Sequence, residues 1–331
     1  MTNILILSAG TRNKVVQAFK KELNGKGKVI ATDCSNIGPA IYDADVQYIV
    51  PRIDAPDYID CILDICKNEE VTGVFSLIDP ELSLLAKNAE RFEEIGVTPI
   101  VSSYELCETS LDKYSMYEML LKLGIPTAKC YKDIDTFESA MEQGETSFPI
   151  FVKPQKGSAS ININAVESQE MLSALFHDYE GLMIQEFMHG QEYGADVYID
   201  MISGKCTSIF LKKKIKMRAG ETDKSISVKD DRIFSQIAEF VEKVGYRGMI
   251  DIDLFHDDET GTWYLSEVNP RFGGGYPHAY ACGVNMPAQI INNLEGIENP
   301  VNIGDYEEDV VMMKYNEIMV MKEEELTGED L

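Results

Sequence analysis

Apolar residues recur with two different spacings along the first hundred positions of the chain. The run Ile4–Leu7 is typical of a buried strand, and similar apolar runs recur at 29–32, 74–78 and 96–101. Between these runs, apolar residues return every three or four positions, the spacing of amphipathic helices; examples are Ile59, Ile62 and Cys66, and then Leu82, Leu85, Ala89 and Phe92. Strands that alternate with helices predict a doubly wound, Rossmann-like α/β domain with a mostly parallel sheet over residues 1–104.

The pattern changes after residue 105. A helix is predicted from Asp112 to about Leu123, because Gly124-Ile125-Pro126 is a typical C-terminal stop. Strands interleaved with a few helices follow, including a helix over about 230–244, so an α+β domain is predicted over 105–318. We expect two lobes in it, a small one over about 126–187 and a larger one over about 188–318. Residues 319–331 are interpreted as an acidic tail.

Composition places the chain among globular proteins. Apolar residues make up 44% of 331 residues, which is enough for real cores. No apolar run is long enough for a membrane span, and Ile4–Leu7 is too short for a signal peptide, so a cytoplasmic protein without a membrane partner is expected. The seven cysteines are scattered, which favours neither a zinc site nor a disulfide framework.

The formal net charge of −26 argues against nucleic acid as a partner, because phosphate backbones require a basic face. Any anionic ligand therefore needs local positive charge to overcome the field of the whole chain. The lysines and arginines, which are outnumbered by acidic residues, are therefore the most informative about where an anionic ligand could bind.

The sequence around Glu267 combines metal-ligand chemistry with a cation. Asp251 and Asp253 are same-side carboxylates of one predicted strand, and Glu267 and Asn269 end the next, with a hairpin turn at 257–261 between the strands. Residues two apart on a strand face the same side, so the oxygen donors of Asp253, Glu267 and Asn269 should converge as ligands for Mg²⁺, with Arg271 at the lip. The alternative is a solvated surface hairpin, in which Arg271 and the three glycines after it have no role.

A second candidate is the small-residue loop after Lys153. Backbone N–H groups of Lys156, Gly157 and Ser158 can lie against phosphate oxygens, and Lys153 and Lys156 can neutralise them. A plain flexible hairpin explains the loop equally well, but the carboxylate cage favours the phosphate interpretation, since nucleotide phosphates and metal ions bind together.

Three other segments are weaker on their own. Leu182–Glu192 suits a purine and ribose site or a core strand with an exposed turn, and Lys113 has the character of a surface lysine. The basic run 212–225 is interpreted as a loop that could hold a terminal phosphate or acyl phosphate. His278 fits a substrate contact or a structural role.

Taken in order, these motifs resemble the ATP-grasp superfamily, and most of all the carbamoyl-phosphate synthase large subunit and its single-unit relatives. The resemblance rests on Asp112-Lys113, on Phe-Pro-Ile-Phe-Val-Lys153 before the glycine loop, on Gln185–Met188 with Glu192, and on Asp253 with Glu267-Val-Asn-Pro-Arg271. It implies a pre-ATP-grasp domain followed by a two-lobed ATP-grasp domain.

The resemblance also implies roles. Lys113 and Lys153 would contact ATP phosphates under a mobile lid at 156–160, Glu186, Phe187 and Met188 would hold adenine, and Glu192 would bind the ribose. Asp253, Glu267 and Asn269 would hold Mg²⁺, or Mn²⁺ in its place. Arg271 would stabilise the carboxylate substrate and its acyl phosphate, and Arg218 belongs to a segment that resembles the loop facing the reacting groups.

The chain departs from the synthases in having room for one ATP-grasp unit, in lacking a glutaminase segment, and in the glycine-rich stretch after Arg271, which suggests space for a bulkier acid. The leading hypothesis is therefore an ADP-forming carboxylate–amine ligase that uses ATP and Mg²⁺. Its partners would be a small carboxylate and an amine or ammonia, with or without a separate amidotransferase subunit, and possibly a second copy in a homodimer. The alternatives are bicarbonate phosphorylation and a non-catalytic ATP-binding subunit.

Overall fold

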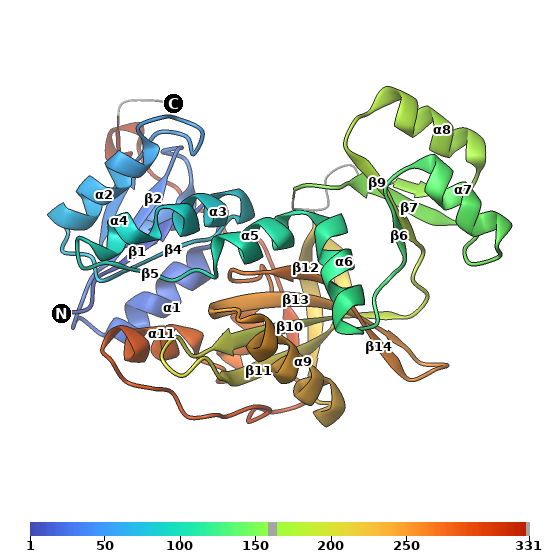
Figure 1. Ribbon diagram of the computed structural model, residues 1–331. Helices are drawn as coiled ribbons and strands as arrows, with labels where there is room; N and C mark the ends of the chain where they lie inside the picture. The colour runs from blue at the N-terminus through green and yellow to red at the C-terminus, as the bar shows by residue number, and fades with distance from the viewer. Residues whose placement is uncertain (158–163, 329–331) are drawn as a thin grey trace.

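The computed structural model describes residues 1–157 and 164–328. Three sheets follow one another across the molecule (Figure 1): a parallel sheet at the N-terminus, a large antiparallel sheet in the middle, and a small antiparallel sheet at the far end. This mixed α/β and α+β architecture confirms the fold class predicted from the sequence. The domain bounds at residues 104, 187 and 318 stay predictions.

The N-terminal sheet is entirely parallel, with strand order β3-β2-β1-β4-β5. Its strands are β1 (Ile4–Leu7), β2 (Val29–Asp33), β3 (Val46–Ile49), β4 (Gly73–Ser76) and β5 (Thr98–Pro99). Its helices are α1 (Asn13–Leu23), α2 (Tyr58–Asn68), α3 (Asp79–Lys87) and α4 (Ala89–Glu93), with a 3-10 turn at Pro39–Asp43. The single helix predicted over 82–92 is interrupted at Asn88. Strand β3 was not predicted, and all four of its residues are only half buried.

Helices α5 (Tyr104–Leu111) and α6 (Lys113–Leu123) lead out of this sheet. Asp112 caps α6, because its Oδ1 accepts hydrogen bonds from the backbone N–H groups of Tyr114 and Ser115 at 3.1 and 3.0 Å. Gly124 ends the helix with φ of +71°, in the left-handed region that glycine adopts without strain. Both ends of this helix agree with the sequence prediction.

The small sheet forms the lid lobe, with strand order β6-β9-β7-β8. Its strands are β6 (Cys130–Tyr131), β7 (Ile150–Pro154), β8 (Asn164–Val166) and β9 (Leu182–Glu186), and its helices are α7 (Ile134–Glu142) and α8 (Gln169–Asp178). A separate core holds the lobe together, built around Phe137, Ile150, Val152 and Leu172, all fully buried. Ser158 and most of the predicted lid loop lie outside the described residues.

The large sheet has strand order β14-β13-β10-β11-β12-β15 and is antiparallel. Its strands are β10 (Gln191–Ile199), β11 (Cys206–Arg218), β12 (Glu221–Val228), β13 (Gly248–Asp257), β14 (Thr262–Asn269) and β15 (Val311–Met313). Its helices are α9 (Asp231–Val244), α10 (Tyr276–Ala281) and α11 (Met286–Leu294), and a 3-10 turn lies at Glu323–Glu325.

The basic run was wrongly predicted as a loop, since residues 212–218 continue strand β11. The reason is the period of two along a strand. Lys212 and Lys214 point inward and are buried, whereas Lys213 is half buried and Ile215 is exposed. Both inward lysines cross strand β10 beside Gly194, where a Cβ atom would lie only 3.1 Å from Lys212 Cε and 3.2 Å from Lys214 Cε. A local charge count could not reveal this, because the neutralising carboxylates come from other strands.

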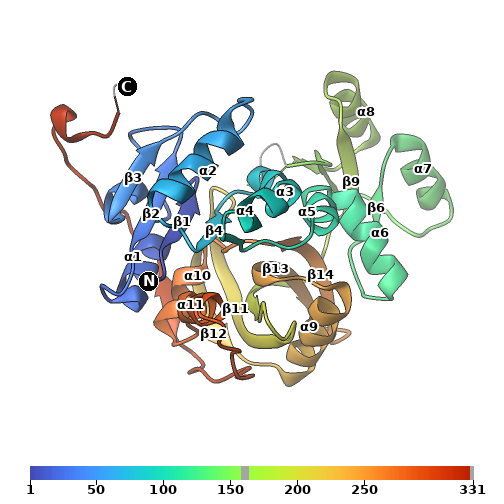
Figure 2. The same ribbon diagram turned by 60° about the vertical axis from the view of Figure 1, so that its left-hand side comes forward.

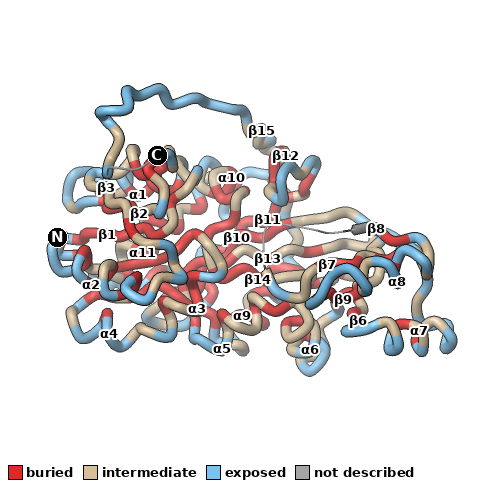
Figure 3. Tube along the Cα trace, turned by 90° about the horizontal axis from the view of Figure 1, so that it is seen from above, coloured by how far each residue is buried: buried red, intermediate tan, exposed pale blue. Residues whose placement is uncertain are grey.

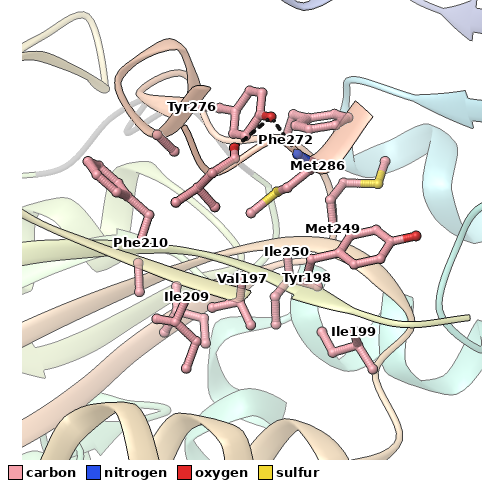
Figure 4. Close-up of a cluster of buried hydrophobic side chains, with 14 of the residues drawn as sticks. Val197, Tyr198, Ile199, Ile209, Phe210, Met249, Ile250, Phe272, Tyr276 and Met286 are labelled. Atoms are coloured by element: carbon pink, nitrogen blue, oxygen red, sulfur yellow. Dashed lines mark hydrogen bonds between the residues drawn. The ribbon is translucent and has the colours of Figure 1, made fainter. Parts of the chain in front are cut away.

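One face of the large sheet changes from charged to apolar along its strands. Its charged half carries Asp196, Lys212 and Asp251, and its apolar half carries residues such as Tyr198, Phe210 and Met249. Figure 4 shows these apolar side chains beneath the segment that holds Phe272, Tyr276 and Met286. Tyr276 Oη accepts a hydrogen bond from the Met286 N–H at 3.0 Å and donates one to the Val284 carbonyl at 3.2 Å. Helix α9 packs its buried face on the other side of the sheet (Figure 2).

Phe272 joins the large sheet to the N-terminal sheet. Its ring lies 6.0 Å from that of Phe19 on α1 and 5.6 Å from that of Phe75 on β4, measured between ring centroids. Because Phe272 directly follows Arg271, this aromatic contact fixes Arg271 against the N-terminal domain. Figure 3 shows that the chain is mostly buried where the N-terminal sheet and the large sheet meet. The chain after β15 runs along the outside of the molecule and is mostly exposed.

Replacing Lys212 by methionine is expected to lower the free energy of unfolding by about 3–5 kcal/mol, because Asp196 would remain buried without its partner. Lys212 is 1% exposed, forms an ion pair with Asp196, and lies 3.7 Å from Asp251. Urea unfolding measures the loss. Lys213→Met on the same strand is the control, because Lys213 is only half buried. A loss of equal size in both variants would contradict the buried ion pair as the cause.

No helix within the described part of the chain has both the length and the apolar character needed to cross a bilayer.

Candidate active site

A cavity of about 210 Å³ lies where the N-terminal sheet, the large sheet and the beginning of α6 meet. The predicted residues on its wall are Lys113, Lys153, Asp253, Glu267, Asn269 and Arg271. The wall also contains charged residues that the sequence analysis did not select for this site, namely Arg12, Asp79, Lys214, Glu221 and Asp251. The tertiary structure thus brings together groups that are up to 259 positions apart, the interval from Arg12 to Arg271.

The hairpin predicted to carry the metal ligands is present. Strands β13 and β14 pair so that Asp253 lies opposite Glu267 and Asp251 lies opposite Asn269. An irregularity in the register between Asp253 and Leu254 leaves one extra residue on β14. The predicted neighbours therefore lie side by side on the cavity wall, although their role as metal ligands stays a prediction.

Glu267 faces two lysines across the cavity. Burial raises the pKa of Glu267, while the positive charges of Lys113 and Lys153 act in the opposite direction and Asp253 adds to the rise. Burial likewise lowers the pKa of Lys153, against the attraction of Glu267. Burying either Glu267 or Lys153 in its charged form would therefore be costly without the other. An additional cation beside the carboxylates of Glu267 and Asp253 would relieve the repulsion between them.

Local structure holds both lysines. Lys153, at 8% exposure, is the penultimate residue of strand β7 and donates a hydrogen bond from Nζ to Gln185 Oε1 at 2.7 Å. Lys113 is the first residue of α6, and its Nζ donates to the Gly157 carbonyl. Asp112 also accepts two hydrogen bonds from Gln155 Nε2, at 2.9 and 2.8 Å, which fixes the loop after β7 to the start of α6. Lys156 lies 4.0 Å from Asp112, with a largely exposed side chain.

The residues predicted to hold adenine and ribose do not line this cavity. Glu186 uses Oε1 to accept a hydrogen bond from the Lys129 N–H at 2.6 Å, and the Phe187 ring stacks on Phe151 at 4.9 Å between centroids. Met188 is half buried, and Glu192 forms an ion pair with Lys214 at 2.7 Å. Their contacts with a nucleotide stay predictions.

Lys214 is a site residue for which the sequence gave only an indirect signal. Its Nζ lies 2.7 Å from Glu192 Oε1 and 2.6 Å from Asp253 Oδ1, with a side chain that is 4% exposed. Burial alone would lower the pKa of Lys214, but Asp253 and Glu192 outweigh it and raise the pKa, so the ammonium group stays charged. It neutralises a predicted metal ligand and a predicted ribose ligand at once. The clue in the sequence was the run Lys212-Lys213-Lys214, whose first and third side chains share one face of a strand.

Arg271 lies between the large sheet and the N-terminal domain. Its guanidinium is 3.2 Å from Asp79 Oδ2 and 3.7 Å from Asp251 Oδ2, with 12% of the side chain exposed. Burial alone would lower the pKa of Arg271, but Asp79 and Asp251 raise it. Asp79 is the first residue of α3, just past the carboxyl end of β4, which is where ligands contact open α/β sheets.

Arg12 enters the cavity from the carboxyl end of β1, on the loop before α1. It forms an ion pair with Glu221 at 2.8 Å, and Lys314 binds the other oxygen of Glu221 at 2.8 Å. Burial lowers the pKa of Arg12 against the attraction of Glu221, and the nearby charge of Arg271 lowers it further. The N-terminal sheet thus provides one wall of the site.

The glycines after Arg271 allow close packing of charged groups. A Cβ on Gly273 would lie 2.5 Å from Asp251 Cγ, and one on Gly274 would lie 2.6 Å from Arg12 Nη1. A residue larger than glycine at either position would therefore displace the charged side chains that line the cavity. The sequence analysis associated these glycines with space for substrate, but most of the freed space is taken up by charged side chains.

Two other candidates lie away from the lining. Arg218 ends strand β11 with 52% of its side chain exposed and pairs with Asp223 at 3.1 Å, so its catalytic role stays a prediction. His278 is 1% exposed, its Nδ1 lies 2.9 Å from Ser225 Oγ, and its Nε2 lies 3.0 Å from the Val310 carbonyl. Burial lowers the pKa of His278 to about 4, and these two contacts favour the structural role.

The donor set of the cavity fits a magnesium ion that also binds phosphate oxygens. Two carboxylates and an amide offer hard oxygen donors, and Mg²⁺ completes its shell with substrate phosphates and water. Across the described residues no three His, Cys, Asp or Glu side chains gather as a closed metal cage. An incomplete protein shell is what a metal ion held jointly with a nucleotide requires.

Two separated lysines, a pair of carboxylates and an amide line one cavity, which is the set of groups that a phosphorylated nucleotide and its metal ion would need. Comparison with known proteins agrees. A family model described as "ATP-grasp domain" matches residues 110–275, and one described as "PylC-like, N-terminal domain" matches residues 4–100. The chain belongs to the ATP-grasp family. Several of its relatives are named as ligases or synthases.

The chain is similar to several characterised proteins of this family. It is 25% identical over 267 residues to a carbamoyl-phosphate synthase of Methanobrevibacter smithii, covering 76% of this chain and 70% of that protein. It is 24% identical over 232 residues to a D-alanine–D-alanine ligase of Pseudomonas entomophila, covering 66% of this chain and 73% of the relative.

Among solved structures, the fold is similar to the biotin carboxylase domain of the Hydrogenobacter thermophilus 2-oxoglutarate carboxylase, solved with MgADP and bicarbonate. The TM-score is 0.74 at 17% identity, with 94% of this chain and 73% of that chain covered.

Proposed function

We propose that this chain activates an organic carboxylate as an acyl phosphate and joins it to an amine or ammonia. The observation that carries the proposal is the arrangement of one cavity with two ends. Lys113, Lys153 and Glu267 lie at one end, and Arg271 lies on the same wall facing the N-terminal domain. A terminal phosphate and a carboxylate can thus meet between them.

The reaction has two steps. A carboxylate oxygen attacks the γ-phosphorus of ATP, the bond to the β,γ-bridging oxygen breaks, and ADP leaves. The amine nitrogen then attacks the acyl carbon, the carbon–oxygen bond to phosphate breaks, and inorganic phosphate leaves with the proton that the nitrogen gives up. Each step needs negative charge to be neutralised as it moves, which is mostly a matter of positioned cations.

The residues of the cavity are assigned accordingly. Lys113 and Lys153 neutralise the phosphate oxygens, and Arg271 orients the substrate carboxylate with its planar fork. Asp253, Glu267 and Asn269 hold Mg²⁺, which when bound withdraws charge from the phosphates. Lys214 keeps Asp253 and Glu192 paired with a cation in the structure without nucleotide.

The remaining sequence predictions belong to the same proposal. We assign adenine to the Glu186–Met188 segment and ribose to Glu192, and we place Lys156, Gly157 and Ser158 at the phosphates. Arg218 is assigned to the loop that faces the reacting groups. A cytoplasmic location and a homodimer complete the proposal.

A second candidate is bicarbonate phosphorylation, which the similarity to a protein named carbamoyl-phosphate synthase favours. Hydroxylamine distinguishes the two, because it traps acyl phosphates as stable hydroxamates. We expect hydroxamate and ADP to form in a 1:1 ratio when purified protein, ATP, Mg²⁺ and hydroxylamine are incubated with a panel of organic acids.

ADP release that bicarbonate stimulates without any organic acid would instead support the second candidate. Tight ATP binding without ADP release from any acid would indicate a non-catalytic nucleotide-binding subunit.

A further inference from the structure

One part of the cavity wall presents charges of both signs. We call it the substrate end and define it by Arg12, Asp79, Glu221, Asp251 and Arg271. These residues come from the N-terminal domain, the β11–β12 hairpin, and strands β13 and β14 with the loop that follows. A substrate that reaches Arg271 from the phosphates must therefore lie against carboxylates as well as guanidinium groups.

The cations of the substrate end are already neutralised by carboxylates. Arg271 lies 3.2 Å from Asp79 and 3.7 Å from Asp251, and Arg12 lies 2.8 Å from Glu221. A simple anion such as bicarbonate would add negative charge to a wall that already carries three carboxylates and two cations, with the phosphates close by. A ligand that carries both charges adds none.

Glu221 is the carboxylate of this set that is most open to a ligand. Its side chain is 39% exposed, compared with 11% for Asp79 and 15% for Asp251. Burial alone would raise the pKa of Glu221, but Arg12 and Lys314 outweigh it and lower the pKa, so the group is ionised at neutral pH. It can accept a further hydrogen bond from an ammonium group.

We propose that the carboxylate substrate is an α-amino acid, with its carboxylate at Arg271 and its ammonium group at Glu221. This inference rests on the ligase function proposed above. Arg12 acts as a positioning residue, because it holds Glu221 in place. Leu77, Ile78 and Met217 provide an apolar part of the wall that can receive the side chain.

The test compares an amino acid with the same acid lacking its amino group, for example leucine with 4-methylpentanoate, in the hydroxamate assay. For the wild-type protein we expect kcat/KM to be about 10- to 100-fold lower without the amino group, the effect of one lost charge-assisted hydrogen bond. Glu221→Gln is expected to raise KM for the amino acid by a similar factor. With the des-amino acid the loss should be clearly smaller, so that Glu221→Gln loses the preference for the amino acid.

Two variants guard against a merely structural effect. Glu221→Asp keeps the negative charge and should restore part of the preference for the amino acid. Glu239→Gln makes the same change on the exposed side of α9, outside the cavity lining, and should behave as wild type.

Equal use of both acids by the wild-type protein, or an equal loss with both acids in Glu221→Gln, would overturn the inference and leave the ligase function standing. Absence of hydroxamate with every organic acid would instead refute the proposed function itself.

Discussion

Replacing Glu267 by glutamine is expected to reduce ADP release by about 10³-fold, because the proposed two-carboxylate site for Mg²⁺ would lose one of its charges. Glutamine has nearly the same shape, so the cross-strand position opposite Asp253 is retained. The change should also raise the Mg²⁺ or Mn²⁺ concentration needed for half-maximal activity. Steady-state ADP release at increasing metal concentration measures both effects.

Thermal stability separates this loss from misfolding. The raised pKa of Glu267 means that its ionised form opposes folding, and this cost grows as the pH rises through the folded-state pKa. A neutral glutamine removes the cost, so Glu267→Gln should melt at or above the wild-type temperature at pH 7. The same substitution at Glu239 is the matched control. Unchanged turnover and metal dependence would refute the assignment of Glu267 to the metal site.

The second large effect is expected at Arg271. Replacing it by lysine should lower kcat by about 10²-fold or more while KM for ATP changes little, because a lysine cannot bind a carboxylate with two parallel N–H groups. The positive charge between Asp79 and Asp251 is kept, which limits damage to the fold. Single-turnover formation of ADP with saturating substrate reports the chemical step directly.

Arg232→Lys provides the control for this experiment, because Arg232 is 70% exposed at the start of α9. The parallel variant Arg218→Lys tests the other predicted catalytic arginine. A larger loss at Arg218 than at Arg271 would reverse the assignment and place the reacting carboxylate at the β11–β12 hairpin.

Local sequence patterns were sufficient where the determinants of structure lie within a few residues. The period of two on β13 and β14 and the turn between them predicted that Asp253 lies beside Glu267, and the register confirms it. The cap at Asp112 and the stop at Gly124 are likewise local, so helix α6 was predicted from end to end. Strand β3 and the extension of β11 were missed, because their burial depends on neighbours that a linear pattern does not contain.

The sequence by itself determined the order of the motifs, the alternation of strands and helices, and the hairpin with its oxygen donors. It also determined the net charge of −26, which made the lysines and arginines the residues to examine for an anionic ligand. Only the tertiary structure decided which charges meet. It brings Arg12 and Asp79 from the carboxyl ends of β1 and β4 to Arg271, and it carries Lys214 across Gly194 to Asp253. The physical reason is that a helix or a turn is set by neighbours in the sequence, whereas burial and charge pairing depend on distances between segments that only the folded chain brings together.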